Sequence, residues 1–171
     1  ISGKKRSLPP ERRKFGMIFQ DFALFPHLSV EDNIAFGVNG SASEKQQRVQ
    51  ELLKLVSLPQ LAKKMPHQIS GGEQQRIAVA RALAPRPRLI LMDEPFSNLD
   101  YQLRQQLRRD IRDILKHEGV ATILVTHDQV EAITFSDRVL LMRDGKLVQS
   151  GTPEEIYQHP QTLWADRKSV V

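Results

Sequence analysis

Three short apolar runs, separated by stretches of helical periodicity, constrain the fold of this chain most strongly. The runs are Phe15–Phe19, Leu89–Met92 and Thr122–Thr126. Runs of this length and composition are typical of buried strands, and we expect Leu89–Met92 to be a central one. Strands that alternate with helices predict an α/β core with a mostly parallel sheet.

The residues between the first two runs are mainly helical in pattern. We expect a short helix over Val30–Phe36 and a longer one over Ser43–Val56, with Ser43 as its N-cap. A third helix begins at Ser70 and ends near Ala84, before a proline. This third helix is apolar nearly all round, which predicts that it is buried.

These helices predict a subdomain of their own, over residues 22–84, beside the sheet. Residues 1–21 and 85–165 are then expected to form the core. Within the core we expect an amphipathic helix over Tyr101–Glu118, and Asp144-Gly145 predicts the turn of a hairpin.

Composition excludes some classes of protein without selecting one. The chain has 171 residues and no cysteine, so disulfides and thiolate metal sites are excluded. No apolar run approaches the length that is needed to cross a bilayer. The net charge of +5 is spread along the chain, which favours a solvated surface over a dedicated patch for nucleic acid or lipid.

The pair Asp93-Glu94 follows the apolar run Leu89–Met92 directly. Ligands of open α/β sheets bind at the carboxyl ends of the strands. An Asp at this place can hold Mg²⁺, and the adjacent Glu can polarise an attacking water. The alternative is a solvent-facing acidic pair at the end of a strand.

The turn Ser70-Gly71-Gly72 precedes the third helix. Its backbone N–H groups and the Ser70 hydroxyl can bind an oxyanion, because glycines permit close approach and a helix N-terminus favours negative charge. The alternative is a capped turn without a ligand. Gln20 and His127 also follow apolar runs directly. His127 could bind a phosphate, and the alternative for both residues is an ordinary polar end of a strand.

In this order, these segments resemble the motifs of the ATP-binding-cassette (ABC) family, from about Leu8 to Trp164. The glutamine loop, signature, Walker B strand, aspartate loop and histidine switch correspond here to Gln20, Ile69–Gln74, Leu89–Glu94, Ser97–Asp100 and His127. Ile69 and Glu73 stand where the family usually has Leu and Gln.

The resemblance implies a P-loop NTPase (RecA-like) core with a helical subdomain, and ATP and Mg²⁺ as cofactors. It implies that Asp93 positions Mg²⁺, that Glu94 is the general base for hydrolysis, and that His127 contacts the γ-phosphate. Gln20 would touch Mg²⁺ or the attacking water.

The resemblance also implies a dimer. The turn Ser70-Gly71-Gly72, together with Gln74, would close over an ATP that a second ABC subunit holds. Asp100 would reach across the same interface. The signature and the Walker B strand of one chain would therefore serve two different ATP molecules.

One family motif is missing from these residues. The phosphate loop G-x-x-x-x-G-K-[ST] should lie upstream of Gln20, and no such run occurs. We therefore expect a core that is incomplete at its N-terminus, with Ile1-Ser2-Gly3 resembling the strand after the phosphate-loop helix. We also expect residues 166–171 to be artefactual, because a common sequencing-adapter sequence encodes them; a plain tail is the alternative.

The segment from Gln20 to Leu28 resembles the glutamine loop of bacterial importers. The resemblance implies transmembrane permease subunits as partners of this segment, an indirect solute-binding protein, no nucleic acid, and a place on the cytoplasmic face of the bacterial inner membrane.

Ferric iron is the favoured substrate, with polyamines, sugars, thiamine and anions as alternatives. The rival functions are a soluble, non-transport ABC ATPase and an inactive binding fragment. We expect this polypeptide alone to lack ATPase activity.

Overall fold

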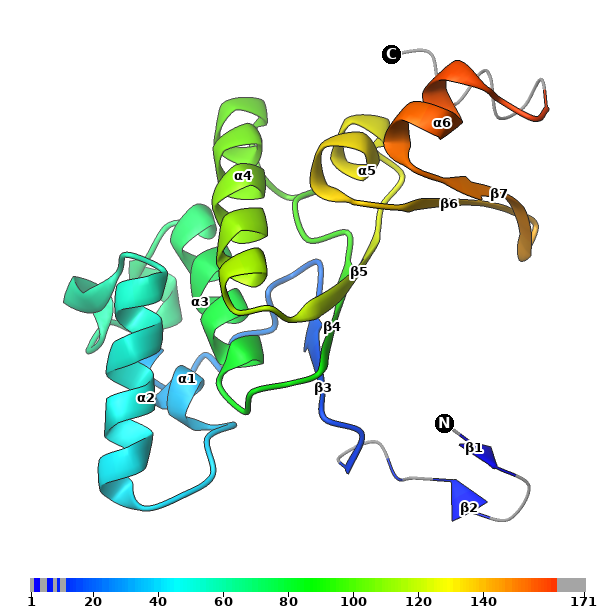
Figure 1. The fold of residues 1–171 in the computed structure, drawn as a ribbon. Coiled ribbons are helices and arrows are strands. Elements are labelled where there is room, and N and C mark those ends of the chain that lie inside the picture. Colours follow the sequence, from blue (N-terminus) through cyan, green and yellow to red (C-terminus); the bar gives the residue numbers. More distant parts are fainter. Residues whose placement is uncertain (1, 4–5, 8, 10–11, 163–171) are drawn as a thin grey trace. The chain divides into compact units, whose positions relative to one another are not determined.

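The computed structural model describes residues 2–3, 6–7, 9 and 12–162 (Figure 1). Ile1 and residues 166–171, two of the segments discussed above, lie outside the described residues. The chain divides into two compact units, Ile1–Val125 and Thr126–Val171. Each unit is described by itself. In the first, β1 (Ser2–Gly3) pairs antiparallel with β2 (Arg6–Ser7).

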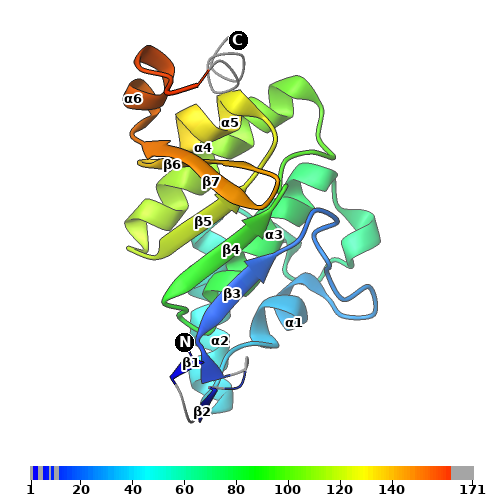
Figure 2. The same ribbon diagram turned by 90° about the vertical axis from the view of Figure 1, so that its right-hand side faces the viewer.

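The first unit contains the predicted parallel sheet. Its strands are β3 (Phe15–Ile18), β4 (Leu89–Asp93) and β5 (Ala121–Val125). They are parallel in the order β3-β4-β5, which makes β4 the central strand as predicted (Figure 2). Parallel neighbours require long crossovers, and the helical stretches between the runs supply them.

The prediction that Phe15–Phe19 forms a buried strand is wrong for one of its faces. Gly16 and Ile18 of β3 are buried, and a Cβ on Gly16 would lie 3.0 Å from the Ala82 carbonyl oxygen of helix α3. On the other face Phe15 is 41% and Met17 is 44% exposed, and residues 123 and 125 of β5 are 52% and 56% exposed. The helices of this unit therefore cover one face of the sheet (Figure 1).

Helix α3 (Gly71–Leu83) is the centre of the packing in this unit. It contacts α1 (Val30–Ala35), α2 (Ala42–Leu55), α4 (Tyr101–His117) and strand β3. Its buried residues face several directions, as its all-round apolar sequence predicted: Gly72, Gln75, Ile77, Ala78, Val79, Ala80, Ala82 and Leu83. Two short 3₁₀ turns, Pro59–Leu61 and Pro66–Gln68, connect α2 to α3.

The N-cap of α2 is Ser41, so the prediction of Ser43 is wrong. The Ser41 hydroxyl accepts a hydrogen bond from the Glu44 N–H, and the Glu44 carboxylate accepts one from the Ser41 N–H at 2.7 Å. In this reciprocal capping box Ser41 and Glu44 bond each other's backbone N–H groups, whereas Ser43 already lies inside the helix as its second residue. The Ser41 hydroxyl also donates to the Glu44 carboxylate at 2.7 Å, and this bond, together with the one from the Ser41 N–H, lowers the pKa of the Glu44 carboxyl.

Replacing Ser41 with Ala should destabilise the protein by about 1 kcal/mol, because an N–H of the first turn loses its acceptor. Ser43→Ala is the matched control and should change the stability little, since Ser43 lies inside the helix. Urea denaturation of both variants measures the difference. Equal effects of the two substitutions would contradict the assignment of the cap.

The second unit holds α5 (Gln129–Phe135), a hairpin and α6 (Pro153–Gln158). Strands β6 (Val139–Arg143) and β7 (Lys146–Gly151) pair antiparallel, as the Asp144-Gly145 turn predicted. Both turn residues have positive φ, 49° and 73°, as a two-residue hairpin turn of this type requires. Among the described residues, no helix combines the length and the apolar character of a membrane span.

Candidate nucleotide-binding site

The carboxyl edge of the parallel sheet brings Gln20 and the pair Asp93-Glu94 together. Ile18 of β3 is in register with Met92 of β4, so both segments leave the sheet at the same level. The Asn98 side-chain amide donates a hydrogen bond to the Gln20 carbonyl oxygen at 3.1 Å. The glutamine loop is thereby joined to the turn that follows Glu94.

Glu94 adopts an uncommon backbone conformation. Its φ is 44°, in the left-handed region, which costs a residue with a side chain about 1–2 kcal/mol. Its N–H donates to the Val125 carbonyl oxygen at 2.9 Å, and its own carbonyl accepts from the Ser97 N–H and hydroxyl at 3.3 and 3.0 Å. These main-chain bonds hold the turn, which sets the direction of the half-buried Glu94 side chain.

The residues at this edge fit a magnesium ion. Asp93 ends β4 and is exposed. No group of three His, Cys, Asp or Glu residues that could hold a metal by itself occurs among the described residues. Mg²⁺ does not need such a group, because it is usually bound by one or two carboxylates together with phosphate oxygens and waters. Asp93 is placed to supply such a carboxylate.

The turn before α3 offers donors to an anion. Ser70 is the N-cap, and its hydroxyl donates to the Glu73 carboxylate at 2.8 Å. The Ser70 N–H donates to the same carboxylate at 2.7 Å. The amides of Gly71 and Gly72 belong to the first turn, where an α-helix has no acceptor of its own. An anion at this turn would meet these amides and would compete with Glu73 for the Ser70 hydroxyl.

The glycines of this turn also permit close packing of α3 on α4. A Cβ on Gly72 would lie 3.1 Å from both δ carbons of Leu103 and 3.2 Å from a δ carbon of Leu107. A Cβ on Gly71 would lie 3.5 Å from Leu99. The signature turn therefore lies against the aspartate loop, and a larger residue in place of Gly72 would separate the two helices.

Gln74 and Asp100 shape the two segments that meet here. The Gln74 side-chain amide donates to the carbonyl oxygens of Pro66 and Ile69 at 3.1 and 3.2 Å, which anchors the approach to the turn. The Asp100 carboxylate caps α4 by accepting from the Leu103 N–H at 3.0 Å. Both side chains are thus oriented by bonds within the first unit.

His127 belongs to the second unit, where it is exposed. Its neighbours in sequence form a capped helix start. Thr126 donates a hydrogen bond to the buried Glu131 carboxylate at 2.7 Å, and the Glu131 N–H donates to the Asp128 carboxylate at 3.0 Å. The first unit contains every other residue of the candidate site: Gln20, Ser70, Gly71, Gly72, Gln74, Asp93, Glu94 and Asp100.

Two residues that organise the glutamine loop were not anticipated from the sequence. Asn33 on α1 is fully buried and forms four hydrogen bonds with the backbone of residues 25–29. Arg81 on α3 donates to the backbone carbonyls of Phe22 and Ala23. For Arg81 the available signal was a single charged residue within an apolar helical stretch, which does not reveal its partner. Asn33 follows two acidic residues, and nothing in that sequence distinguishes it from them.

Comparison with known proteins identifies the family. The family model for ABC transporters matches residues 2–97, which is more than half of the chain. This chain belongs to the ABC transporter family. Its parallel sheet with helices is the α/β, P-loop NTPase type of fold of the solved ABC proteins that it resembles.

Relatives of known function are importer subunits. The chain is 57% identical over 157 residues to the Fe(3+) ions import ATP-binding protein FbpC 2 of Pectobacterium atrosepticum, covering 91% of this chain and 45% of the relative. It is 49% identical over 161 residues to the putrescine transport ATP-binding protein PotG of Escherichia coli, covering 92% and 43%. The chain therefore spans about half the length of the curated relatives that it matches.

Solved structures show the same ABC fold. CbiO1 of Clostridium perfringens, part of the ABC transporter complex cbiONQ, matches with a TM-score of 0.78 at 28% identity, over 92% of this chain and 61% of that one. A dimeric ATP-binding cassette in a post-hydrolysis state, bound to ADP and Pi, matches with a TM-score of 0.68 at 33% identity, over 84% and 65%.

Proposed function

We propose that this ABC chain is part of the ATP-binding and ATP-hydrolysing subunit of a bacterial importer. The carrying observation is the Glu94 turn at the carboxyl end of β4, where main-chain bonds fix a carboxylate beside Asp93 and the glutamine loop. A solvent-facing acidic pair would not require a strained turn that is held on both sides.

In this proposal Asp93 would hold Mg²⁺, which would supply charge neutralisation at the transferring phosphoryl group when bound. Glu94 accepts the proton of the attacking water. Gln20 orients that water or the ion from the neighbouring strand. His127 contacts the γ-phosphate. The phosphate-loop Lys and hydroxyl would come from residues outside this chain, and the exposed apolar face of the sheet supports the view that further chain packs on it.

The signature turn acts on a second subunit's ATP. An anion is favoured here by the amides of Gly71 and Gly72, by the Ser70 hydroxyl and by the positive end of the α3 dipole. The dipole alone contributes about 0.3–1 kcal/mol. Gln74 maintains the turn, and Asp100 lies at the same face. A dimeric cassette bound to ADP and Pi among the structural relatives supports a dimeric arrangement.

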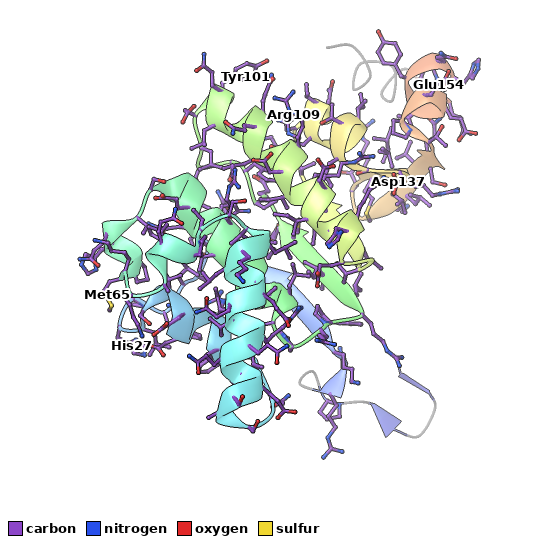
Figure 3. All side chains as sticks on the ribbon, turned by 60° about the vertical axis from the view of Figure 1, so that its left-hand side comes forward. His27, Met65, Tyr101, Arg109, Asp137 and Glu154 are labelled. Atoms are coloured by element: carbon purple, nitrogen blue, oxygen red, sulfur yellow. The ribbon has the colours of Figure 1, made fainter. Side chains whose placement is uncertain are left out.

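The glutamine loop and α1 form the docking surface for the permease. Phe36 is 69% exposed, and its ring centroid lies 4.6 Å from that of Phe25. His27, labelled in Figure 3, is exposed, and its ring centroid lies 6.1 Å from that of Phe25. An exposed aromatic cluster beside half-buried Leu24 and Leu28 suits the apolar side of a short helix from a membrane subunit. In this proposal the subunit lies on the cytoplasmic face of the membrane.

Ferric iron is the substrate that we favour. The iron import relative is more similar than the putrescine transport relative, 57% against 49% identity. Disrupting the gene that encodes this chain should abolish high-affinity uptake of radiolabelled ferric iron and leave uptake of putrescine unchanged, because each importer depends on its own ATPase. Loss of putrescine uptake with normal iron uptake would reassign the substrate. Normal uptake of both would exclude ferric iron and putrescine and would leave a sugar, thiamine or anion importer or the soluble, non-transport ATPase.

A further inference from the structure

Arg81, in the last turn of α3, holds the loop that follows Gln20. Its guanidinium donates from Nη1 to the Ala23 carbonyl oxygen at 2.6 Å and from Nη2 to the Phe22 carbonyl oxygen at 3.2 Å. Its Cζ atom lies 5.2 Å from the centroid of the Phe25 ring, a distance at which cation–π attraction operates. Burial lowers the pKa of this guanidinium, as expected of a charge that is partly withdrawn from water.

The two carbonyls that Arg81 binds belong to an unusual turn. Phe22 has φ of 62° and Ala23 has φ of 46°, so two successive residues with side chains lie in the left-handed region. Such residues avoid this region because Cβ crowds the following carbonyl oxygen. The turn therefore needs partners outside itself, and it places both carbonyls within reach of a single guanidinium.

Helix α3 connects this turn to the signature. Ser70 caps its N-terminus, and Arg81 lies eleven residues further on, which corresponds to about 16 Å along a helix axis. One continuous helix thus joins the Ser70-Gly71-Gly72 turn to Arg81. A displacement of that turn would be carried along this helix to Arg81.

We propose that Arg81 is the positioning residue that couples the signature turn to the permease-docking loop, through the carbonyls of Phe22 and Ala23. The inference rests on the proposed function. Arg81 acts through the backbone of the loop that it holds. It fixes the turn from which Leu24, Phe25 and Leu28 reach the docking surface, so that closure over ATP and the shape of that surface change together.

The substitution Arg81→Lys tests the hold on the turn. Lysine keeps the charge, but it cannot place two donors on two carbonyls in a fixed plane. Arg76→Lys is the matched control, because Arg76 lies on the same helix and binds Asp110 and the Val56 carbonyl instead of the loop. Amide hydrogen exchange is measured by mass spectrometry in the purified protein. Arg81→Lys should speed exchange in residues 22–28 about tenfold, the factor that corresponds to one lost charge-assisted hydrogen bond.

Arg76→Lys should leave exchange in that loop unchanged. Unchanged exchange in Arg81→Lys, or the same increase in both variants, would overturn the inference. This measurement needs neither ATP nor a permease, so its outcome does not depend on the proposed function.

The coupling itself is tested in the full-length subunit assembled with its permease in lipid vesicles. Arg81→Lys should lower the permease-stimulated rate of ATP hydrolysis by a larger factor than the rate of the free subunit. A purely structural role would lower both rates together. Equal stimulation in Arg81→Lys and in the unsubstituted subunit would overturn the coupling. Absence of ATP hydrolysis in the unsubstituted subunit would instead overturn the proposed function.

Discussion

Glu94→Gln in the full-length subunit should lower ATP hydrolysis by about 10²–10⁴-fold, the usual contribution of a general base, and leave ATP binding intact. Gln has nearly the shape of Glu but accepts no proton at neutral pH. The hydrogen bonds that hold the Glu94 turn join the main-chain N–H and carbonyl of Glu94 to Val125 and Ser97. The substitution changes only the side chain and preserves these bonds. The loss should therefore fall on chemistry and spare the fold.

Because binding persists while hydrolysis stops, the Glu94→Gln subunit should accumulate as a closed dimer with ATP. Light scattering measures the dimer, and release of inorganic phosphate measures turnover. Glu154→Gln is the matched control, since Glu154 is an exposed carboxylate on α6 (Figure 3), and it should retain normal turnover. Normal turnover in Glu94→Gln would show that another group is the base. The 171-residue chain alone, which contains no phosphate-loop sequence, should show no turnover in the same assay.

Asn33→Ala should destabilise the protein by about 2–4 kcal/mol, because it leaves several buried backbone groups without a partner. The Asn33 side-chain carbonyl accepts from the Phe25 N–H at 2.8 Å. Its amide donates to the carbonyl oxygens of Phe25, Leu28 and Ser29 at 3.0–3.1 Å. Alanine can replace none of these bonds, and a loop without them would not hold its shape.

Urea denaturation of Asn33→Ala measures the loss of stability. Asn39→Ala is the control, because Asn39 is exposed in the loop after α1, and it should change stability by less than about 0.5 kcal/mol. If Asn33→Ala were as stable as the control, then the hydrogen bonds of Asn33 would not be what holds residues 25–29 in place.

Much of the fold follows from local pattern. The parallel strands, the central place of β4, the buried helix after Ser70 and the hairpin at Asp144-Gly145 were predicted correctly, because apolar periodicity and turn chemistry act over a few neighbouring residues. The N-cap of α2 was misplaced from Ser41 to Ser43, since both serines precede the apolar periodicity and only the reciprocal bond to Glu44 separates them.

The candidate site was predictable to a different extent. Its residue types follow strand ends and a helix start, so their chemistry can be inferred from the sequence, and the parallel register places Gln20 beside Asp93-Glu94. Their catalytic and binding roles remain predictions. Arg81 and Asn33 were not predicted from the sequence, because each side chain binds backbone atoms of a loop. The partner Ala23 lies more than fifty residues from Arg81 along the chain.

The sequence by itself determined where each parallel strand ends to within one residue and which turn opens α3, because periodicity and capping are local and the family motifs lie in a readable order. Tertiary structure alone decided three further features. One face of β3 and β5 is exposed, Gly72 packs against Leu103 and Leu107, and Arg81 binds the turn after Gln20. The physical reason is the same in each case: these features depend on how separate elements pack, and packing joins atoms that no spacing along the chain brings together.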